Sequence, residues 1–277
     1  MKFLTKEDWE KKLKELSFDK TNSSKESNIE KIFFEVTKRM RELIYKKNFD
    51  HNTFGIAMTL FHYYVCFNDL RSIDRIEICF ACLYMSSKIQ FYNYPISNFI
   101  NDYRNYIKDK PNYQKKPDPD FIKYEIQLYS QLGYDIDIET PFHFFYDSLE
   151  SFFKKFPFMR DKTKMDKLKH FCFNLLIDTY TRPLSIYYHP KIIYLSCLIF
   201  SLKFLEFNEC DINLLIKDEN IDLIKDCMEK ILQIYSRFLE DNTNKNKNNN
   251  INNDDKDINN KNNNEKNDGN INENNNN

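Results

Sequence analysis

The sequence is poor in glycine, with only Gly55, Gly133 and Gly269 in 277 residues. Strand-rich and nucleotide-binding folds use glycine in tight turns and phosphate-binding loops, so this scarcity favours an all-helical protein without a phosphate loop. Basic residues are not in excess either, because 41 Lys and Arg stand against 42 Asp and Glu. Proteins that bind nucleic acid mainly through its phosphates usually have that excess. We therefore expect no direct nucleic-acid contact.

Segments that would direct the chain to a membrane are also missing. No apolar run reaches the ~20 residues that span a bilayer, and "IIYLSCLIFSL" has roughly half of them. The start, "MKFLTKEDWEKKLKEL", is charged throughout and lacks the apolar stretch of a signal peptide. The seven cysteines are odd in number and lack the spacing of a disulfide framework, which indicates reduced thiols in the cytosol or nucleus. We expect a soluble intracellular protein without a membrane partner.

Aromatic residues, in contrast, are abundant, with 25 Phe and 18 Tyr to fill a core. Apolar residues recur every three or four positions, which is the helical period. The pattern predicts helices near 5–16, 29–46, 52–66, 73–90, 95–107, 119–132, 140–155, 162–181, 189–205 and 219–239. Asp120 and Thr140 are expected helix caps, with Pro141 in the first turn after Thr140. Gly133 is expected in the left-handed region after a helix end.

Polar stretches divide the chain. Residues 1–28 form a predicted N-terminal helix and linker, and residues 108–120 form a loop with three prolines. More than half of residues 241–277 are asparagine and none is aromatic, which predicts a disordered low-complexity tail. The body between them is divided into two predicted domains, 29–135 and 136–240.

The two domains share an internal repeat. "ACLYMSSK" (81–88) matches "SCLIFSLK" (196–203) in the pattern small residue, Cys, Leu, two apolar residues, Ser, any residue, Lys. Cys82 and Cys197 are 115 residues apart, which is too long for a short-repeat solenoid. The spacing suits two bundles of roughly five helices, each with one nearly all-apolar central helix. The lysine that ends each central helix suits the helix dipole.

Chemistry-bearing residues do not form a catalytic pattern. Cys79 and Cys82 make a Cys-x-x-Cys pair, but no second ligand pair follows at zinc-site spacing. Both lie in the most apolar predicted helix, where cysteine packs as a small apolar residue. The five histidines are scattered, without a nucleophile motif or a helix-borne ligand pair. We predict a binding protein without catalytic residues, metal or cofactor.

Several motifs, in their order and spacing, resemble the cyclin family. "ACLYMSSK" resembles the third helix of a cyclin box, and "KYEIQLYSQLGYDIDIETPFHFF" resembles the fifth helix followed by the start of a second box. "LIDTYTRPLSIYYHPKIIYLSCL" resembles the transcriptional group of cyclins C, H, K, L and T. "NDLRSIDRIEI" and "CMEKILQIYSRFLE" are most similar to cyclin C, and "FYNYPISNFI" and "LESFFKKFP" are about as similar to cyclin H. The resemblance covers about residues 29–240 and implies two tandem five-helix cyclin boxes.

The resemblance also implies a function. The chain would be the regulatory subunit that binds and activates a cyclin-dependent kinase, in a nuclear complex linked to RNA polymerase II transcription. In the family, the lysine that ends the third helix and a glutamate in the fifth hydrogen-bond the kinase backbone, and the matching residues are Lys88 and Glu125. The expected apolar rim is Ile89, Tyr129, Tyr134 and Ile136. The alternative is a Lys–Glu pair that only joins two helices of this chain.

Some features depart from the family pattern. "IQF" (89–91) follows Lys88 where many cyclins have two acids, and "MREL" (40–43) lies near the end of its helix, unlike the docking patch of cell-cycle cyclins. Three alternatives stay open: a cell-cycle cyclin, a scaffold without a kinase, and a nucleic-acid-binding relative similar to the RNA polymerase II general factor B. A third assembly subunit or a larger transcription complex would be a further partner.

Overall fold

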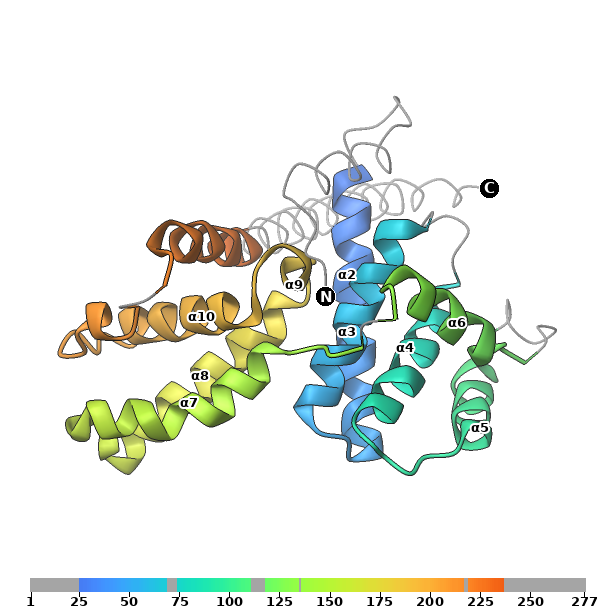
Figure 1. Cartoon of the computed structure of the whole chain (residues 1–277), viewed down its shortest axis with the longest axis horizontal. Coiled ribbons are helices and arrows are strands. Elements are labelled where there is room, and N and C mark those ends of the chain that lie inside the picture. The colour runs from blue at the N-terminus through green and yellow to red at the C-terminus, as the bar shows by residue number, and fades with distance from the viewer. Residues whose placement is uncertain (1–24, 69–73, 111–117, 135, 217–218, 237–277) are drawn as a thin grey trace, which may run out of the picture. The chain divides into compact units, whose positions relative to one another are not determined.

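The computed structural model describes residues 25–68, 74–110, 118–134, 136–216 and 219–236, which form helices and turns without a β-strand (Figure 1). The predicted all-α class is confirmed. The helices are α2 (Lys25–Lys47), α3 (His51–Phe67), α4 (Arg75–Ile89), α5 (Ile96–Ile107), α6 (Phe121–Gln131), α7 (Pro141–Lys155), α8 (Lys162–Thr179), α9 (Leu184–Tyr187), α10 (Pro190–Phe204) and a last helix at 221–236. The predicted helix at 5–16 and the predicted disordered tail lie outside the described residues. None of the described helices combines the length and apolarity needed to cross a lipid bilayer.

The first bundle, α2 to α6, is built around α3 and α4. Every residue of α3 from Thr53 to Cys66 is buried, and α4 packs on α3, α5 and α6. Hydrogen bonds to Glu77 near the start of α4 join the neighbours, since Tyr103 of α5 and Tyr124 of α6 donate to its two carboxylate oxygens at 3.2 and 2.8 Å. The tyrosines thereby fix the positions of α5 and α6 against α4.

The second bundle packs α7, α8 and α9 on α10. Most of α10 is buried, as expected for a helix that is apolar on every side. The last helix also contacts α10, because the Ser196 hydroxyl donates to the Ile224 carbonyl at 3.3 Å. The chain divides into two compact units, residues 1–231 and 232–277, and of the second unit only the helix residues 232–236 are described. The domain boundary at 135/136 stays a prediction.

The internal repeat is confirmed by α4 and α10, which span equivalent residues 115 positions apart. Cys82 and Cys197 are both fully buried, and so are Ser86 and Ser201. Within each helix these serines donate to a backbone carbonyl, Ser86 to that of Leu83 and Ser201 to that of Cys197, so both serine hydroxyls are satisfied. Both helices therefore tolerate burial on all sides.

The two bundles meet where α3 contacts α7 and α9. His62 of α3 is fully buried there, with Nδ1 3.1 Å from the Ser185 hydroxyl and Nε2 3.1 Å from the Tyr180 carbonyl. A carbonyl can only accept a hydrogen bond, so Nε2 carries the proton and Nδ1 accepts from Ser185. The Thr37 hydroxyl of α2 lies 2.9 Å from the same Tyr180 carbonyl. This polar cluster connects the bundles inside an apolar junction.

The burial of His62 predicts a pH-dependent stability. Burial lowers the pKa of its imidazole from 6.5 to about 3, so the unfolded chain takes up a proton more readily than the folded chain. Stability therefore falls as the pH drops below the unfolded value of 6.5. We expect this residue to cost about 2 kcal/mol of unfolding free energy at about pH 5. Urea unfolding measured between about pH 5 and pH 7 should show that the unfolding free energy of His62→Gln depends less on pH than that of the wild type. The same pH dependence in both proteins would contradict the prediction.

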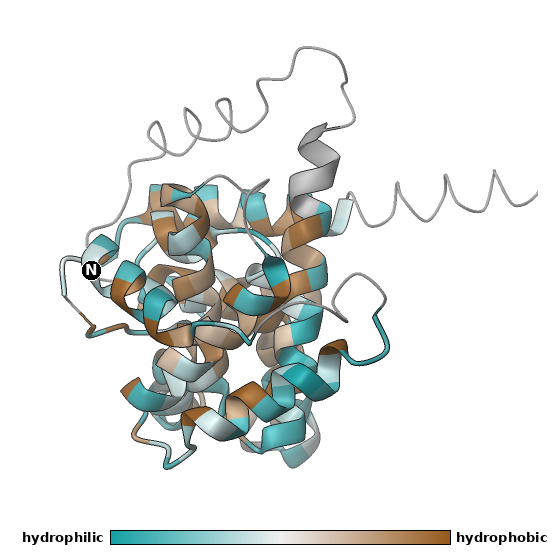
Figure 2. Cartoon of the chain, turned by 90° about the vertical axis from the view of Figure 1, so that its right-hand side faces the viewer, coloured by the Kyte–Doolittle hydropathy of each residue, from teal (hydrophilic) through white to brown (hydrophobic). Residues whose placement is uncertain are grey.

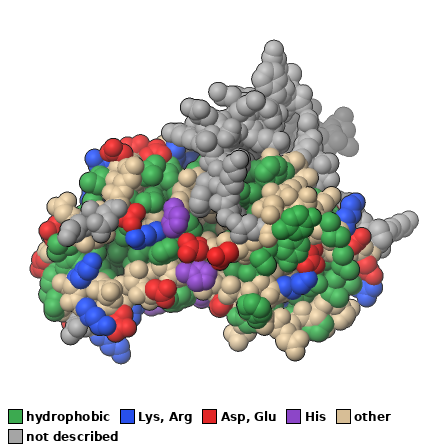
Figure 3. All heavy atoms as spheres, in the orientation of Figure 1, with side chains coloured by type: hydrophobic (Ala, Val, Ile, Leu, Met, Phe, Trp, Pro, Cys, Tyr) green, Lys and Arg blue, Asp and Glu red, His purple; other side chains and the backbone are tan. Residues whose placement is uncertain are grey.

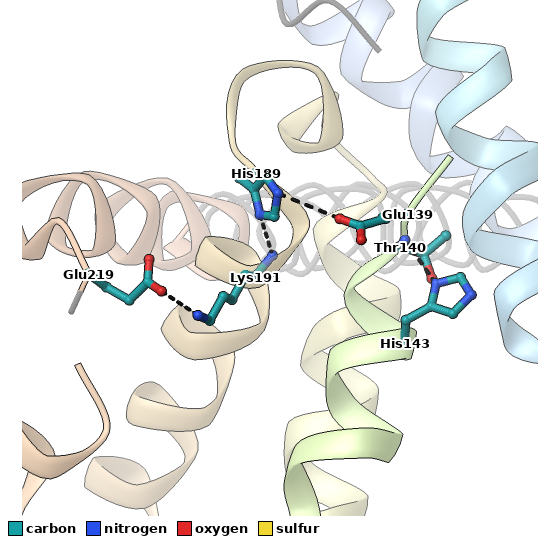
Figure 4. A network of polar contacts seen from close by, with 6 residues as sticks. All are labelled: Glu139, Thr140, His143, His189, Lys191 and Glu219. Carbon is teal, nitrogen blue, oxygen red and sulfur yellow. Dashed lines mark hydrogen bonds and ion pairs between the residues drawn. The ribbon is translucent and has the colours of Figure 1, made fainter. Parts of the chain in front are cut away.

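The second bundle begins with a capped helix, as predicted. Thr140 precedes Pro141 at the start of α7, and the Thr140 N–H donates to Nδ1 of His143 at 3.1 Å (Figure 4). Nearby, Nε2 of His189 lies 3.5 Å from a Glu139 oxygen, so this linker carboxylate contacts the segment before α10. The predicted cap at Asp120 is confirmed at α6, where its side chain accepts from the Lys123 N–H.

Candidate protein-interaction site

The end of α4 meets α6 at a Lys–Glu ion pair. Lys88 in the last turn of α4 donates from Nζ to an oxygen of Glu125, which is in the middle of α6. The Glu125 side chain is 11% exposed and that of Lys88 is 44% exposed. Burial alone would lower the pKa of Lys88, but the hydrogen bond and charge of Glu125 raise it above its usual value. Lys88 is therefore positively charged at neutral pH. Its ammonium group is hydrogen-bonded to Glu125, and the rest of the side chain is partly exposed to solvent.

Aromatic rings flank this pair. The Lys88 ammonium lies 5.2 Å from the centre of the Tyr84 ring, which adds a cation–π contact. Burial and the neighbouring charge of Glu125 raise the pKa of Tyr129, which also hydrogen-bonds that carboxylate. Of the residues predicted for this site, the structure thus brings Lys88, Glu125 and Tyr129 together.

The remaining predicted residues lie on the flanking segments. Ile89 is half-buried at the end of α4. Tyr134 and Ile136 follow the end of α6 and are 75% and 40% exposed. Gly133 has φ 65°, as predicted for the residue after this helix end, and Tyr134 shares the left-handed conformation at φ 63°. These residues are accessible to a partner, and the contacts described above do not connect Tyr134 or Ile136 directly to the ion pair.

Sequence reasoning missed three exposed apolar residues on the segments that carry the pair. Ile122 and Ile126 of α6 are 56% and 61% exposed, while Phe121, Glu125 and Leu128 of the same helix face inward. Phe91, just after α4, is 94% exposed. Figure 2, which turns the α5 and α6 side toward the viewer, shows apolar segments among polar ones along these helices. The signal in the sequence was that "FIKYEIQLYSQ" has apolar residues on two faces, more than one core requires.

We call this region the Lys88 surface: Lys88, Glu125, Ile89, Tyr129, Phe91, Ile122 and Ile126. A desolvated charge pair with aromatic and aliphatic side chains around it has the composition of a protein-binding hot spot. The Cys-x-x-Cys pair near it does not offer reactive thiols, because Cys79 and Cys82 are fully buried in α4. Burial raises the pKa of Cys79 to about 12 and that of Cys82 well above its usual value. Among the described residues, no His, Cys, Asp and Glu side chains cluster as metal ligands would.

The turn that presents Phe91 holds backbone strain. Phe91 has φ 57°, a left-handed conformation that glycine usually adopts after a helix end. The Phe91 and Tyr92 N–H groups donate to the Lys88 and Ser87 carbonyls, which is the usual closing pattern of such an end. A non-glycine residue pays roughly 1–2 kcal/mol in this region.

Replacing Phe91 by glycine should therefore stabilise the fold. We expect Phe91→Gly to raise the unfolding free energy by about 1 kcal/mol, measured by urea denaturation. Glu206 at the equivalent turn after α10 has φ 58° and serves as the matched site, where Glu206→Gly should give a similar gain. A loss of stability in both variants would contradict the strain assigned to these turns.

The sequence was compared with those of known proteins. The chain is 21% identical over 199 residues to cyclin-K of Danio rerio, a match that covers 68% of this chain and 45% of that protein. It therefore spans less than half the length of this relative. No protein-family model matches the chain.

Solved structures share its fold. A chain in the crystal structure of the yeast RNA Pol II CTD kinase CTDK-1 complex has a TM-score of 0.64 at 14% identity, covering 84% of this chain and 72% of that one. A chain in the cryo-EM structure of the yeast TFIIK (Kin28/Ccl1/Tfb3) complex has a TM-score of 0.58 at 18% identity, covering 83% and 96%. The chain has the cyclin fold and resembles the transcriptional cyclins. In a cyclin fold, α2 to α6 form the first box, and Lys88 and Glu125 lie on its third and fifth helices.

Proposed function

We propose that this chain is the regulatory subunit of a cyclin-dependent serine/threonine kinase that acts in RNA polymerase II transcription. The observation that carries the proposal is the Lys88–Glu125 pair, partly exposed among apolar side chains at the two positions where cyclins contact their kinase. The similarity to cyclin-K and to chains of transcription-linked kinase complexes supports the same assignment.

The proposed mechanism uses docking energy and no chemistry on this chain. The kinase lays its regulatory C-helix and the adjoining backbone on the Lys88 surface. Lys88 offers N–H donors beyond the one that Glu125 accepts, and these can bind backbone carbonyls of the partner. Glu125 can accept from a backbone N–H. Inward movement of the kinase C-helix then completes the kinase's own Lys–Glu ion pair and orders its activation loop.

Apolar contact would provide most of the affinity. Phe91, Ile122 and Ile126 are exposed in the free chain, and their burial by a partner removes apolar area from water. The contacts around them exclude water from the Lys88–Glu125 pair, which strengthens each charged hydrogen bond. Tyr134 and Ile136 would extend the interface past the end of α6.

The finer assignments are part of the same proposal. The complex would act in the nucleus, with a role near that of cyclin C or cyclin H, and a third subunit could join it. The general-factor-B-like alternative has little support, because Lys and Arg do not exceed Asp and Glu in this chain. Two alternatives remain, a cell-cycle cyclin and a scaffold that binds no kinase. The experiment below distinguishes both from the proposal.

The test is affinity purification of the tagged full-length chain, followed by mass spectrometry and a kinase assay. We expect one cyclin-dependent kinase at about equal stoichiometry and phosphorylation of peptides with RNA polymerase II tail repeats. The level of the chain should stay constant through a synchronised division cycle. A periodic level together with no activity on these repeats would instead assign the chain to the cell-cycle group, and recovery without a kinase would indicate a scaffold.

A further inference from the structure

The end of α10 presents an exposed aromatic ring beside a lysine. Phe204 is 64% exposed, and its ring stacks on Phe171 of α8 with centroids 4.6 Å apart and planes 8° from parallel. Phe200, one turn earlier in α10, is also nearly parallel to it at 6.4 Å. Lys203 is exposed and forms no ion pair with any residue that the structure describes. The ring is therefore oriented by its stacking on Phe171 while most of its surface stays exposed to solvent.

This end of α10 is the counterpart of the Lys88 surface in the internal repeat. Lys203 matches Lys88, and the turn after it closes with the same pattern, in which Glu206 and Phe91 are both left-handed. The difference is the counter-ion. Lys88 is paired with Glu125, whereas no described carboxylate pairs with Lys203. The second bundle thus repeats the cation without its partner acid, and it has the exposed Phe204 where the first bundle has the half-buried Ile89.

A groove of about 630 Å³ lies beside the ring, along the outer face of α8. It is lined by two lysines (Lys162 and Lys167), by the apolar Phe171 and Leu205, and by the polar Thr163, His170 and Asn174. Asp166 is the only acid among the described residues that line it. Figure 3 shows Lys and Arg side chains together with Asp and Glu side chains among apolar ones over the α7 to α10 half. The groove therefore combines apolar side chains with two lysines against one aspartate, and Lys203 adds a further cation at its end.

We propose that this Lys203 surface (Lys203, Phe204 and the α8 groove) binds an acidic segment of a partner protein that carries an aromatic side chain next to a carboxylate. The carboxylate supplies the counter-ion that Lys203 lacks within the described chain, as Glu125 does for Lys88. Further acids meet Lys162 and Lys167, which gives charge complementarity along the groove. The aromatic side chain packs against the exposed part of the Phe204 ring. The inference uses none of the residues of the Lys88 surface and does not depend on kinase binding.

Peptide selection tests the proposal directly. A phage library of random dodecapeptides is selected on the full-length chain, with the double variant Lys203→Glu/Phe204→Ala as the counter-selection target. We expect enriched peptides with Asp or Glu beside Phe, Tyr or Trp. A fluorescein-labelled enriched peptide then gives the Kd by polarisation, and each single variant should weaken binding about ten-fold or more. Added salt should weaken wild-type binding more than that of Lys203→Glu.

The matched control is Lys154→Glu, which makes the same charge change on an exposed lysine of α7 that pairs with Glu150. It should leave the Kd unchanged. Lys203→Glu loses a cation from the last turn of α10 and Phe204→Ala loses the stacking on Phe171, so both variants should stay folded with a melting temperature only slightly below the wild-type value. Equal Kd values for wild type and both variants, or enriched peptides without acids, would overturn the proposal. So would a dimer in sedimentation that Phe204→Ala dissociates, because the occupant would then be a second copy of the chain.

Discussion

Lys88→Ala and Glu125→Ala should each reduce kinase binding by roughly thirty-fold or more while the chain stays folded. Removing one partner of a desolvated charge pair commonly costs about 2–5 kcal/mol, because the other charge is left buried and unpaired in the complex. In the free chain the cost is smaller, since Lys88 is 44% exposed and water can replace part of the pair. The measurement is a pull-down titration of the kinase, with the melting temperature of each free variant beside it.

Lys203→Ala is the matched control for this prediction, because Lys203 ends the repeated helix α10 as Lys88 ends α4. It should leave kinase binding unchanged. If both Lys88→Ala and Glu125→Ala bind the kinase as the wild type does, the Lys88 surface is not the docking site. If the variants instead lose helical content and melt early, the pair only joins α4 to α6.

Gly55→Val should lower the unfolding free energy by about 3 kcal/mol, at the upper end of the cost of overpacking a core. A Cβ at Gly55 of α3 would lie 2.8–2.9 Å from the side chain of Thr140 and 2.9 Å from the Tyr180 hydroxyl. Both neighbours are buried, with Thr140 at 0% and Tyr180 at 1% exposure, so neither has room to move. The glycine thus lets the start of the second bundle approach α3.

A double variant shows whether the stability loss comes from this steric clash or from a lower helix propensity of the new residue in α3. Tyr180→Phe removes the hydroxyl that a Cβ at Gly55 would meet, and should restore part of the stability lost in Gly55→Val. Thermal unfolding of the wild type, both single variants and the double variant gives the interaction energy. Strict additivity of the two changes would contradict the close contact between α3 and Tyr180.

The sequence predicted those features that depend on local chemistry. Asp120, Thr140 with Pro141, and Gly133 each have a backbone preference that acts within one helix turn, and each lies where expected. The repeat also predicted that α4 and α10 are buried on all sides, because only surrounding helices can cover a helix without a polar face. Helix bounds differ from the predicted ones by a few residues.

Features that depend on tertiary packing were not predictable in this way. Helix α9 is a single turn in "TRPLSIYYHP", too short to show a helical period, and it is stabilised at the junction beside His62. The exposure of Ile122 and Ile126 depends on which face of α6 meets α4, and both faces are apolar in the sequence. The Lys88–Glu125 contact joins residues 37 positions apart, and only the family resemblance indicated it in advance.

The most direct test of the regulatory role is the activity of the co-purified kinase with and without this chain. The kinase is expressed alone, and its rate on an RNA polymerase II tail-repeat peptide is measured as full-length chain is added. The account predicts a large rise in the kinase rate that saturates at one chain per kinase. With the Lys88→Ala variant, a much higher concentration should be needed to reach the same rate. A kinase whose rate is the same alone and with saturating chain would contradict the account.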